Sequence, residues 1–226
     1  EGAGNYTLIA IGFGALLIGF FFWKRKSNSK TTVEKEVSAP SKNLTSKENY
    51  QAGIYLFGGF KLINKEGKDL TNLFSPKRKE LFVLVLLYSF RKNGISSKQM
   101  SDILWEGHSF ESAKNNRSTQ MKRIREILSE NTGVSIDYDN KNWKIEIEEG
   151  VGWDFSTYSY FKNEISTKGE DKKIIEANVN GLLNVINQGV LLPNMHFEWL
   201  DPFKSQLSEE VVEVLTPLME NDQLKL

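Results

Sequence analysis

The chain has 226 residues, and its 29 Lys and Arg residues balance its 29 Asp and Glu residues. The length fits one or two domains, and the lack of cysteine excludes disulfide bonds, thiolate metal sites and cysteine nucleophiles. The charge is unevenly distributed: residues 52–150 hold 16 basic and 13 acidic side chains (+3), and residues 151–226 hold 6 and 12 (−6). An anionic partner is therefore expected to bind the middle of the chain.

Residues 6–23, YTLIAIGFGALLIGFFFW, form an uncharged run. A helix of this length spans about 27 Å, enough for the core of a bilayer. The cations KRK at 24–26 follow it, and such a surplus marks the cytoplasmic side. A signal peptide, the competing interpretation, needs its cations before the apolar run, where only Glu1 is charged. We expect an extracytoplasmic segment at 1–5, a single transmembrane helix at 6–23, and a location in the inner cell membrane with the C-terminal part in the cytoplasm.

Residues 24–51 are rich in Ser, Lys, Thr, Glu and Asn and show no apolar period, which predicts a flexible cytoplasmic tether. Residues 54–70 have a different pattern. Short β-prone runs are interrupted at Gly58-Gly59 and at Glu66-Gly67, which predicts a small sheet of short strands.

Two helices are predicted next from their capping signals. Ser-Pro at 75–76 is typical of an N-cap followed by proline in the first helical position, and Asn-Gly at 93–94 is typical of a helix end. Residues 81–90 are apolar around most of the circumference, so this helix should be central and buried. A capping box, S-x-x-Q at 96–99, predicts the start of a second helix.

A third helix is predicted at 112–128, where Met121, Ile124 and Leu128 form an apolar stripe with Ile127 beside it. Only Glu111 and Glu126 oppose the cations of its other surface, which carries Lys114, Asn115, Asn116, Arg117, Ser118, Thr119, Gln120, Lys122, Arg123 and Arg125. Cations for phosphates, mixed with amides and hydroxyls for base edges, are typical of a helix in the major groove. A solvated amphipathic helix is the open alternative.

Residues 134–140 and 142–149 alternate at period two around Asn140-Lys141-Asn142, which predicts a β-hairpin. The order is thus small sheet, long helix, helix, basic helix and hairpin. With its motifs, this order resembles the winged-helix effector domain of OmpR-type response regulators, and still more the N-terminal half of SARP-type activators. The motifs are LFGGFKL at 56–62, FSPKRKELFVLVLL at 74–87, MSDILWEG at 100–107, KRIREIL at 122–128 and NWKIEI at 142–147.

The resemblance continues more weakly after the hairpin. WDFSTYSYF at 153–161 and GVLLPNMHFEWLDPFKSQL at 189–207 resemble the entry into the helical, tetratricopeptide-like activator domain of SARP-type proteins. About three helices fit before Leu226, and they must pack on the winged helix or on another chain to bury their apolar faces. The last helix, predicted at 209–219, is expected to expose Glu209, Glu210 and Glu213.

The resemblance implies an α+β fold: a winged helix-turn-helix domain with an N-terminal sheet at 52–150, and a short α-helical region at 151–226. It also implies DNA contacts from the third helix and the wing. Arg123 occupies the position of a base-contacting arginine, Arg125 binds phosphate or pairs with Glu126 or Glu130, and Arg117 departs from the family pattern, which has Leu. The implied DNA-binding residues are Lys114, Asn115, Asn116, Ser118, Thr119, Lys122, Arg123, Arg125, Lys141 and Asn142.

Motifs for catalysis are missing from the sequence. His108 and His196 lack a carboxylate-rich partner motif, and no phosphate-binding glycine loop occurs. We expect no enzyme activity, cofactor or metal. The resulting hypothesis is a membrane-tethered, sequence-specific transcription regulator that couples an extracytoplasmic signal to gene expression. Double-stranded DNA, the membrane, RNA polymerase and a second copy bound on DNA are its candidate partners. The alternative is a winged helix that binds a protein in a membrane signalling assembly and does not bind DNA.

Overall fold

The structure is a computed structural model that describes residues 51–167 and 172–220, which belong to one compact unit. The segment predicted at 1–5, the transmembrane helix predicted at 6–23 and the tether up to residue 50 lie outside the described residues. Among the helices that are described, none has the length and apolar character needed to cross a bilayer.

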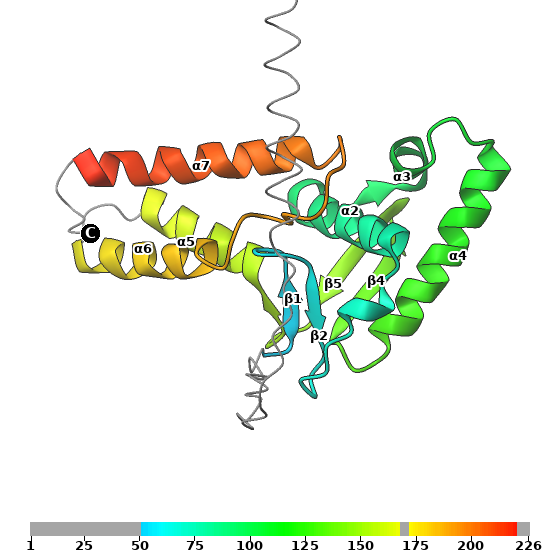
Figure 1. Cartoon of the computed structure of the whole chain (residues 1–226), viewed down its shortest axis with the longest axis horizontal. Helices are drawn as coiled ribbons and strands as arrows, with labels where there is room; N and C mark the ends of the chain where they lie inside the picture. Colours follow the sequence, from blue (N-terminus) through cyan, green and yellow to red (C-terminus); the bar gives the residue numbers. More distant parts are fainter. Residues whose placement is uncertain (1–50, 168–171, 221–226) are drawn as a thin grey trace, which may run out of the picture. The chain divides into compact units, whose positions relative to one another are not determined.

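The predicted small sheet is present, and it has a further strand that follows the wing in the sequence. β1 (Gly53–Tyr55) pairs antiparallel with β2 (Lys61–Ile63) and parallel with β6 (Gly152–Trp153). Figure 1 shows β1 and β2 beside the start of the helical region. Gly58 lies just after β1 at φ 73°, and a Cβ there would meet the carbonyl oxygen of Gln188 at 2.3 Å. Only glycine fits where that later segment crosses the sheet.

The short 3-10 helix η1 (Thr71–Leu73) leads into α2 (Pro76–Lys92), whose predicted caps are confirmed. Ser75 Oγ accepts from the Arg78 backbone, Pro76 opens the helix, and Asn93 ends it in the left-handed conformation. Residues 81–87 are buried as predicted, but Phe90 is 42% exposed. The prediction fails there because α2 reaches the edge of the core, where Phe90 packs edge-on against Trp153.

The winged helix-turn-helix follows in the predicted order. β3 (Ile95–Ser96) leads into α3 (Ser97–Leu104), where Ser96 and Gln99 form the capping box, and then into α4 (Phe110–Leu128). The wing consists of β4 (Val134–Asp139) and β5 (Asn142–Ile147), and its sheet has the order β3-β5-β4.

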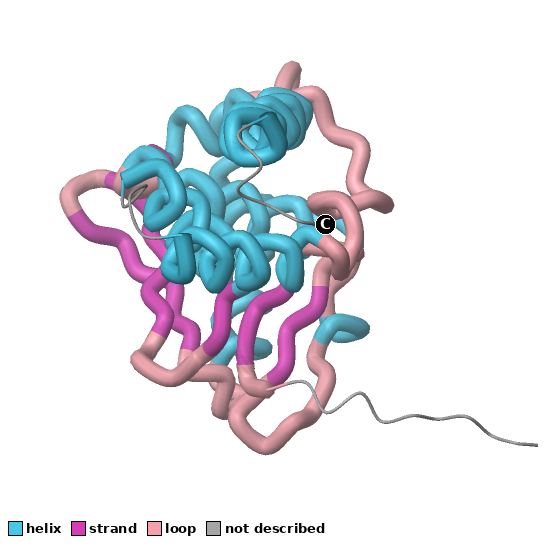
Figure 2. Tube along the Cα trace, turned by 90° about the vertical axis from the view of Figure 1, so that its left-hand side faces the viewer, coloured by secondary structure: helices cyan, strands magenta, loops and turns pink. Residues whose placement is uncertain are grey.

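The wing closes through a two-residue turn in which Asn140 and Lys141 have φ of 48° and 65°. Positive φ at both positions is the type I′ turn that joins twisted strands. Figure 2 shows the strands side by side with most of the helices on one side of them.

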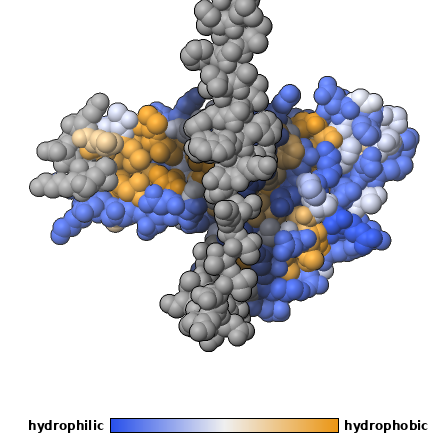
Figure 3. Space-filling model, viewed as in Figure 1, coloured by the Kyte–Doolittle hydropathy of each residue, from blue (hydrophilic) through white to orange (hydrophobic). Residues whose placement is uncertain are grey.

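Three helices pack on the winged helix: α5 (Asp154–Thr167), α6 (Lys172–Ile186) and α7 (Asp201–Glu220). Their apolar faces share one hydrophobic cluster with α2 and the sheets. Figure 3 shows apolar side chains over α7 and the space between α7 and α6. The segment 189–200 returns to the first sheet, where Leu192 N–H donates to Leu56 O at 2.9 Å, so the helical region is joined to the winged helix at several places.

The prediction that Glu210 lies on a solvated face is wrong. Its carboxylate accepts from Tyr158 Oη at 3.2 Å and pairs with Lys162 at 3.2 Å and with Arg91 of α2 at 3.8 Å. Glu209 and Glu213 are exposed as predicted. The period of α7 places Glu210 on the border of the apolar face, where α2 and α5 supply partners that the local sequence does not reveal.

Candidate nucleic-acid interface

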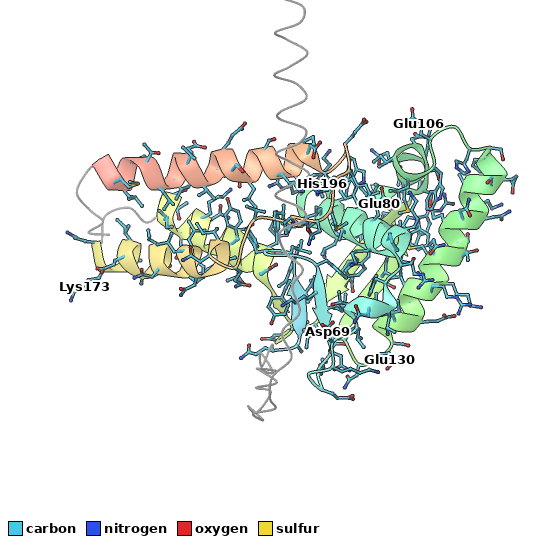
Figure 4. All side chains as sticks on the ribbon, in the orientation of Figure 1. Asp69, Glu80, Glu106, Glu130, Lys173 and His196 are labelled. Carbon is cyan, nitrogen blue, oxygen red and sulfur yellow. The ribbon has the colours of Figure 1, made fainter. Side chains whose placement is uncertain are left out.

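Helix α4 lies at the edge of the described unit and is attached by its predicted apolar stripe. Met121, Ile124 and Leu128 are at most 5% exposed, and they pack in the same cluster as α2. In Figure 4 the labelled Glu130 lies near the C-terminal end of α4, and the labelled Glu106 lies at the end of α3. The stripe therefore fixes which surface of α4 is available to a partner.

Successive residues of a helix are about 100° apart around its axis, so the position of the stripe determines the direction in which each remaining side chain of α4 points. Asn115, Ser118, Thr119 and Lys122 point away from the core and are exposed. Within the described residues, none of these four side chains has a hydrogen bond or an ion pair. Four predicted site residues thus form a free polar surface along the helix, which we call the α4 outer face.

The other predicted residues of α4 lie on its flanks. Asn116 and Arg123 lie on the flank away from the wing, and Lys114 and Arg125 lie on the opposite flank. Arg123 Nη1 is 2.8 Å from Glu126 Oε2, and its side chain is 60% exposed. Lys114 Nζ is 3.8 Å from Glu111. Exposed pairs of this kind contribute at most about 1 kcal/mol, so both cations can exchange a carboxylate for a phosphate or a base.

Arg117 does not belong to the outer face. Its Nη1 donates to Ser97 O at 3.2 Å and to Ser101 Oγ at 2.8 Å, both on α3. The stem of Arg117 follows the core while its guanidinium bonds the neighbouring helix. Arg117 therefore fixes the angle between α3 and α4.

Arg125 also has partners that the sequence did not predict. Its Nε and Nη2 donate to Ile136 O at 3.1 and 2.9 Å, and its guanidinium lies 5.3 Å from the centre of the Trp143 ring. Neither Glu126 nor Glu130 pairs with it, because Glu126 binds Arg123 and Glu130 binds Lys68. Arg125 therefore joins α4 to the wing.

The wing carries charges of both signs. Lys141 is exposed in the turn, and Asn142, at the start of β5, is partly buried and lies opposite Asp139. Asp139 also pairs with Lys144 at 3.6 Å, and Asp137 is exposed on the same strand. Lys141 is thus the cation at the tip that is best placed to reach a phosphate.

A hollow of about 480 Å³ separates α4 from the wing. Ser118, Lys122 and Ser129 line it from α4, and Trp143 lines it from the wing. Ser129 was not predicted, although its spacing of 11 residues from Ser118 and 7 from Lys122 keeps it on one side of the helix. Trp143 could not be assigned from helical spacing, because its place depends on the pairing of the hairpin strands.

The described residues 51–167 and 172–220 contain no group of three or more His, Cys, Asp or Glu side chains that could hold a metal ion. His108 instead lies at the start of α4, where its Nδ1 is 3.4 Å from Ser112 Oγ.

No protein-family model and no curated protein sequence matches the chain. A search of solved structures finds Mycobacterium tuberculosis EmbR, determined in complex with a low-affinity phosphopeptide. The match has a TM-score of 0.59 and 15% sequence identity, and it covers 73% of this chain and 43% of that one. The chain therefore spans less than half of the length of EmbR. At this identity the likeness concerns the fold alone, and it supports a mixed α+β fold similar to that of EmbR.

Proposed function

We propose that this protein is a sequence-specific, double-stranded-DNA-binding transcription regulator held at the membrane by residues 6–23. The observation that carries the proposal is the α4 outer face. It presents unpaired amide, hydroxyl and ammonium groups on a helix that Arg117 and Arg125 hold against α3 and the wing. A rigid helix with free polar groups is what reading base edges requires, because each misplaced donor loses its bond.

In a winged helix the N-terminal half of the recognition helix enters the major groove, and the wing reaches the adjacent backbone. Asn115 and Asn116 lie in that half, and an Asn amide can bond both N6 and N7 of adenine. Arg123 can release Glu126 and present its fork to guanine. Lys122, which lines the hollow, and Lys141, which is exposed in the wing turn, are the candidate ligands for phosphates.

The charge of this surface predicts modest affinity for one copy. Lys114 pairs with Glu111 and Arg123 pairs with Glu126 on the same helix, so few phosphates are neutralised. With about three or four phosphate contacts, including Lys141, the slope of log K against log salt is about −3. A second copy on a neighbouring half-site would raise the affinity, so we propose that DNA is bound as a homodimer.

The membrane attachment is part of the proposal and rests on the apolar run at 6–23 and the cations that follow it. The signal would come from outside the cytoplasm and change the spacing or orientation of the DNA-binding units near the membrane, where RNA polymerase is a further candidate partner. Reporter fusions after Lys30 test the topology. A reporter that is active only outside the cytoplasm at this position contradicts the proposal, because DNA would be out of reach.

The alternative function is binding to a protein. The observation in its favour is Phe110, 76% exposed at the start of α4 beside a hollow of about 690 Å³ that Trp105 also lines. Glu111 and Glu126 also reduce the attraction of α4 for DNA.

Binding to random-sequence duplex DNA over a range of salt concentrations decides between the two functions. The proposed function predicts a sequence preference that survives selection, and a negative salt slope. Binding that shows neither property, or no binding at all, favours the protein-interaction module.

A further inference from the structure

We propose that Arg125 is a positioning residue that fixes the wing against α4, and that it does not itself bind DNA phosphate. In this role it sets the separation between the α4 outer face and the turn that carries Lys141. The inference rests on the proposed function in so far as that separation matters for DNA, whereas the contact itself can be tested without DNA.

The geometry of the arginine points to this role. Two of its donors, Nε and Nη2, converge on one acceptor, Ile136 O, at 3.1 and 2.9 Å. The same guanidinium lies 5.3 Å from the Trp143 ring centre, within the range of a cation–π contact. One side chain of α4 thereby contacts both strands of the wing.

Ile136 O needs a partner from outside the sheet. The turn at 140–141 makes Asp139 and Asn142 the first hydrogen-bonded pair of the hairpin, so bonded and non-bonded pairs alternate from there. Ile136 and Ile145 then form a non-bonded pair, which agrees with the bond from Ile145 N to Ser89 Oγ on α2. Because β4 is the edge strand, Ile136 O points out of the sheet, where Arg125 satisfies it.

The outer half of the wing has few other anchors. Residues 137–139 of β4 are exposed, and Tyr138 contacts Trp143 at 4.9 Å between ring centres. Trp143 Nε1 donates to Ser97 Oγ at 2.9 Å, and Ser96 pairs with Asn142. These contacts hold β5 to α3, and among the described residues Arg125 is the side chain of α4 that hydrogen-bonds the wing.

A phosphate ligand is the competing role, because Arg125 lines the same hollow as Lys122 and keeps Nη1 available. The two roles predict different measurements. A positioning residue controls the order of the wing in free protein and leaves the salt slope unchanged. A phosphate ligand leaves the order of the free wing unchanged and contributes about one to the salt slope.

The test compares Arg125→Met with Lys122→Met, which changes an exposed cation three residues earlier on the same helix. Hydrogen–deuterium exchange of the full chain, purified in a mild detergent, is followed in the wing (137–144) and, as an internal reference, in α2. We expect exchange in the wing to rise about tenfold or more in Arg125→Met, as for a lost charged hydrogen bond, with α2 unchanged. Lys122→Met should exchange like the wild type in both regions.

Each outcome decides the inference. Unchanged wing exchange in Arg125→Met overturns it. If that variant unfolds as a whole, Arg125→Lys is measured instead. Its single ammonium cannot reproduce the two hydrogen bonds to Ile136 O, so exchange should rise in the wing and stay unchanged in α2. Wing exchange equal to that of the wild type would overturn the inference.

A DNA titration separates this inference from the proposed function. With a selected duplex, Arg125→Met should bind more weakly, because binding must then order the wing, but at an unchanged salt slope, because Lys141 contacts the backbone once the wing is ordered. Lys122→Met should lower the slope by about one. A slope lowered by about one in Arg125→Met, with unchanged wing exchange, makes Arg125 a phosphate ligand and leaves the proposed function intact. If wild type selects no DNA while wing exchange still depends on Arg125, the wing contact stands and the proposed function fails.

Discussion

Charged side chains have different surroundings on α4 and on the core-facing side of α7. On α4, Arg123 and Glu126 form an exposed pair, and Lys122 has no partner in the described part of the chain. On α7, Glu210 is bound by Arg91, Lys162 and Tyr158 between three helices.

The difference is set by what lies opposite each helix. The side chain of Glu210 is 17% exposed, so removing it leaves partly desolvated cations without a partner. The Arg123–Glu126 pair of α4 is solvated, so Arg123 can change its partner at little cost. The helical region therefore holds its charges for structure, and α4 keeps its polar groups available for a ligand.

The largest expected effect comes from a carboxylate on the core-facing side of α4, compared with the same change on its outer face. Met121→Asp places a carboxylate in the core, where Met121 is 2% exposed, and should lower the free energy of unfolding by about 4 kcal/mol or more. Lys122→Asp, one residue later on the outer face, should change it by less than about 0.5 kcal/mol. Urea denaturation of both variants measures this, and equal losses would mean that the orientation of α4 is wrong.

Asp154, the buried first residue of α5, makes the stability of the helical region depend on pH. Burial raises the pKa of this carboxyl to about 6, although the Leu56 and Phe57 backbone N–H groups, which donate to Oδ2 at 2.7 and 2.9 Å, lower it. The unfolded state loses this proton at lower pH than the folded state. The stabilisation by protonated Asp154 is therefore complete below about pH 4 and is lost as pH rises through 6, a loss of about 3 kcal/mol.

Asp154→Asn isolates that effect, because the amide can still accept from the same backbone N–H groups and does not ionise. Unfolding at pH 4.5 and pH 7.5 should show a smaller loss of stability in the variant than in the wild type. An equal loss in both proteins would assign the pH dependence to other groups.

A smaller effect is expected at the border of α7. Glu210→Ala should lower the free energy of unfolding by about 2 kcal/mol, because Arg91 and Lys162 lose their shared partner. Glu213→Ala, an exposed change three residues later, should cost less than about 0.5 kcal/mol. If the two variants unfold at the same denaturant concentration, the contrast between α7 and α4 is lost.

Local signals predicted most of the winged helix. The caps at Ser75 and Ser96 and the turn at Asn140-Lys141 depend on neighbouring residues, and all three appear where they were expected. The pairing of β6 with β1 was not predicted, since it joins segments about 100 residues apart.

In the candidate site, too, local pattern predicted some features and contacts distant in sequence determined others. Helical period separated the apolar stripe of α4 from its polar side, and the structure agrees. The period could not show which arginines are engaged, because the partners of Arg117 and Arg125 lie on α3 and on the wing. A basic residue that the helical pattern assigns to a binding surface can instead have a structural role, when a neighbouring element supplies an acceptor for its hydrogen bonds.

Selection from a random duplex pool with wild type, Arg123→Ala and Lys114→Ala shows whether the exposed polar surface of α4 recognises a DNA sequence. We predict a preferred site for the wild type. Arg123→Ala should lose discrimination of about 1–3 kcal/mol at one base pair. Lys114→Ala should keep the site but bind all sequences more weakly, with a salt slope lowered by about one. A wild type that selects no sequence, or an Arg123→Ala variant that selects the same site with undiminished discrimination, would contradict the account.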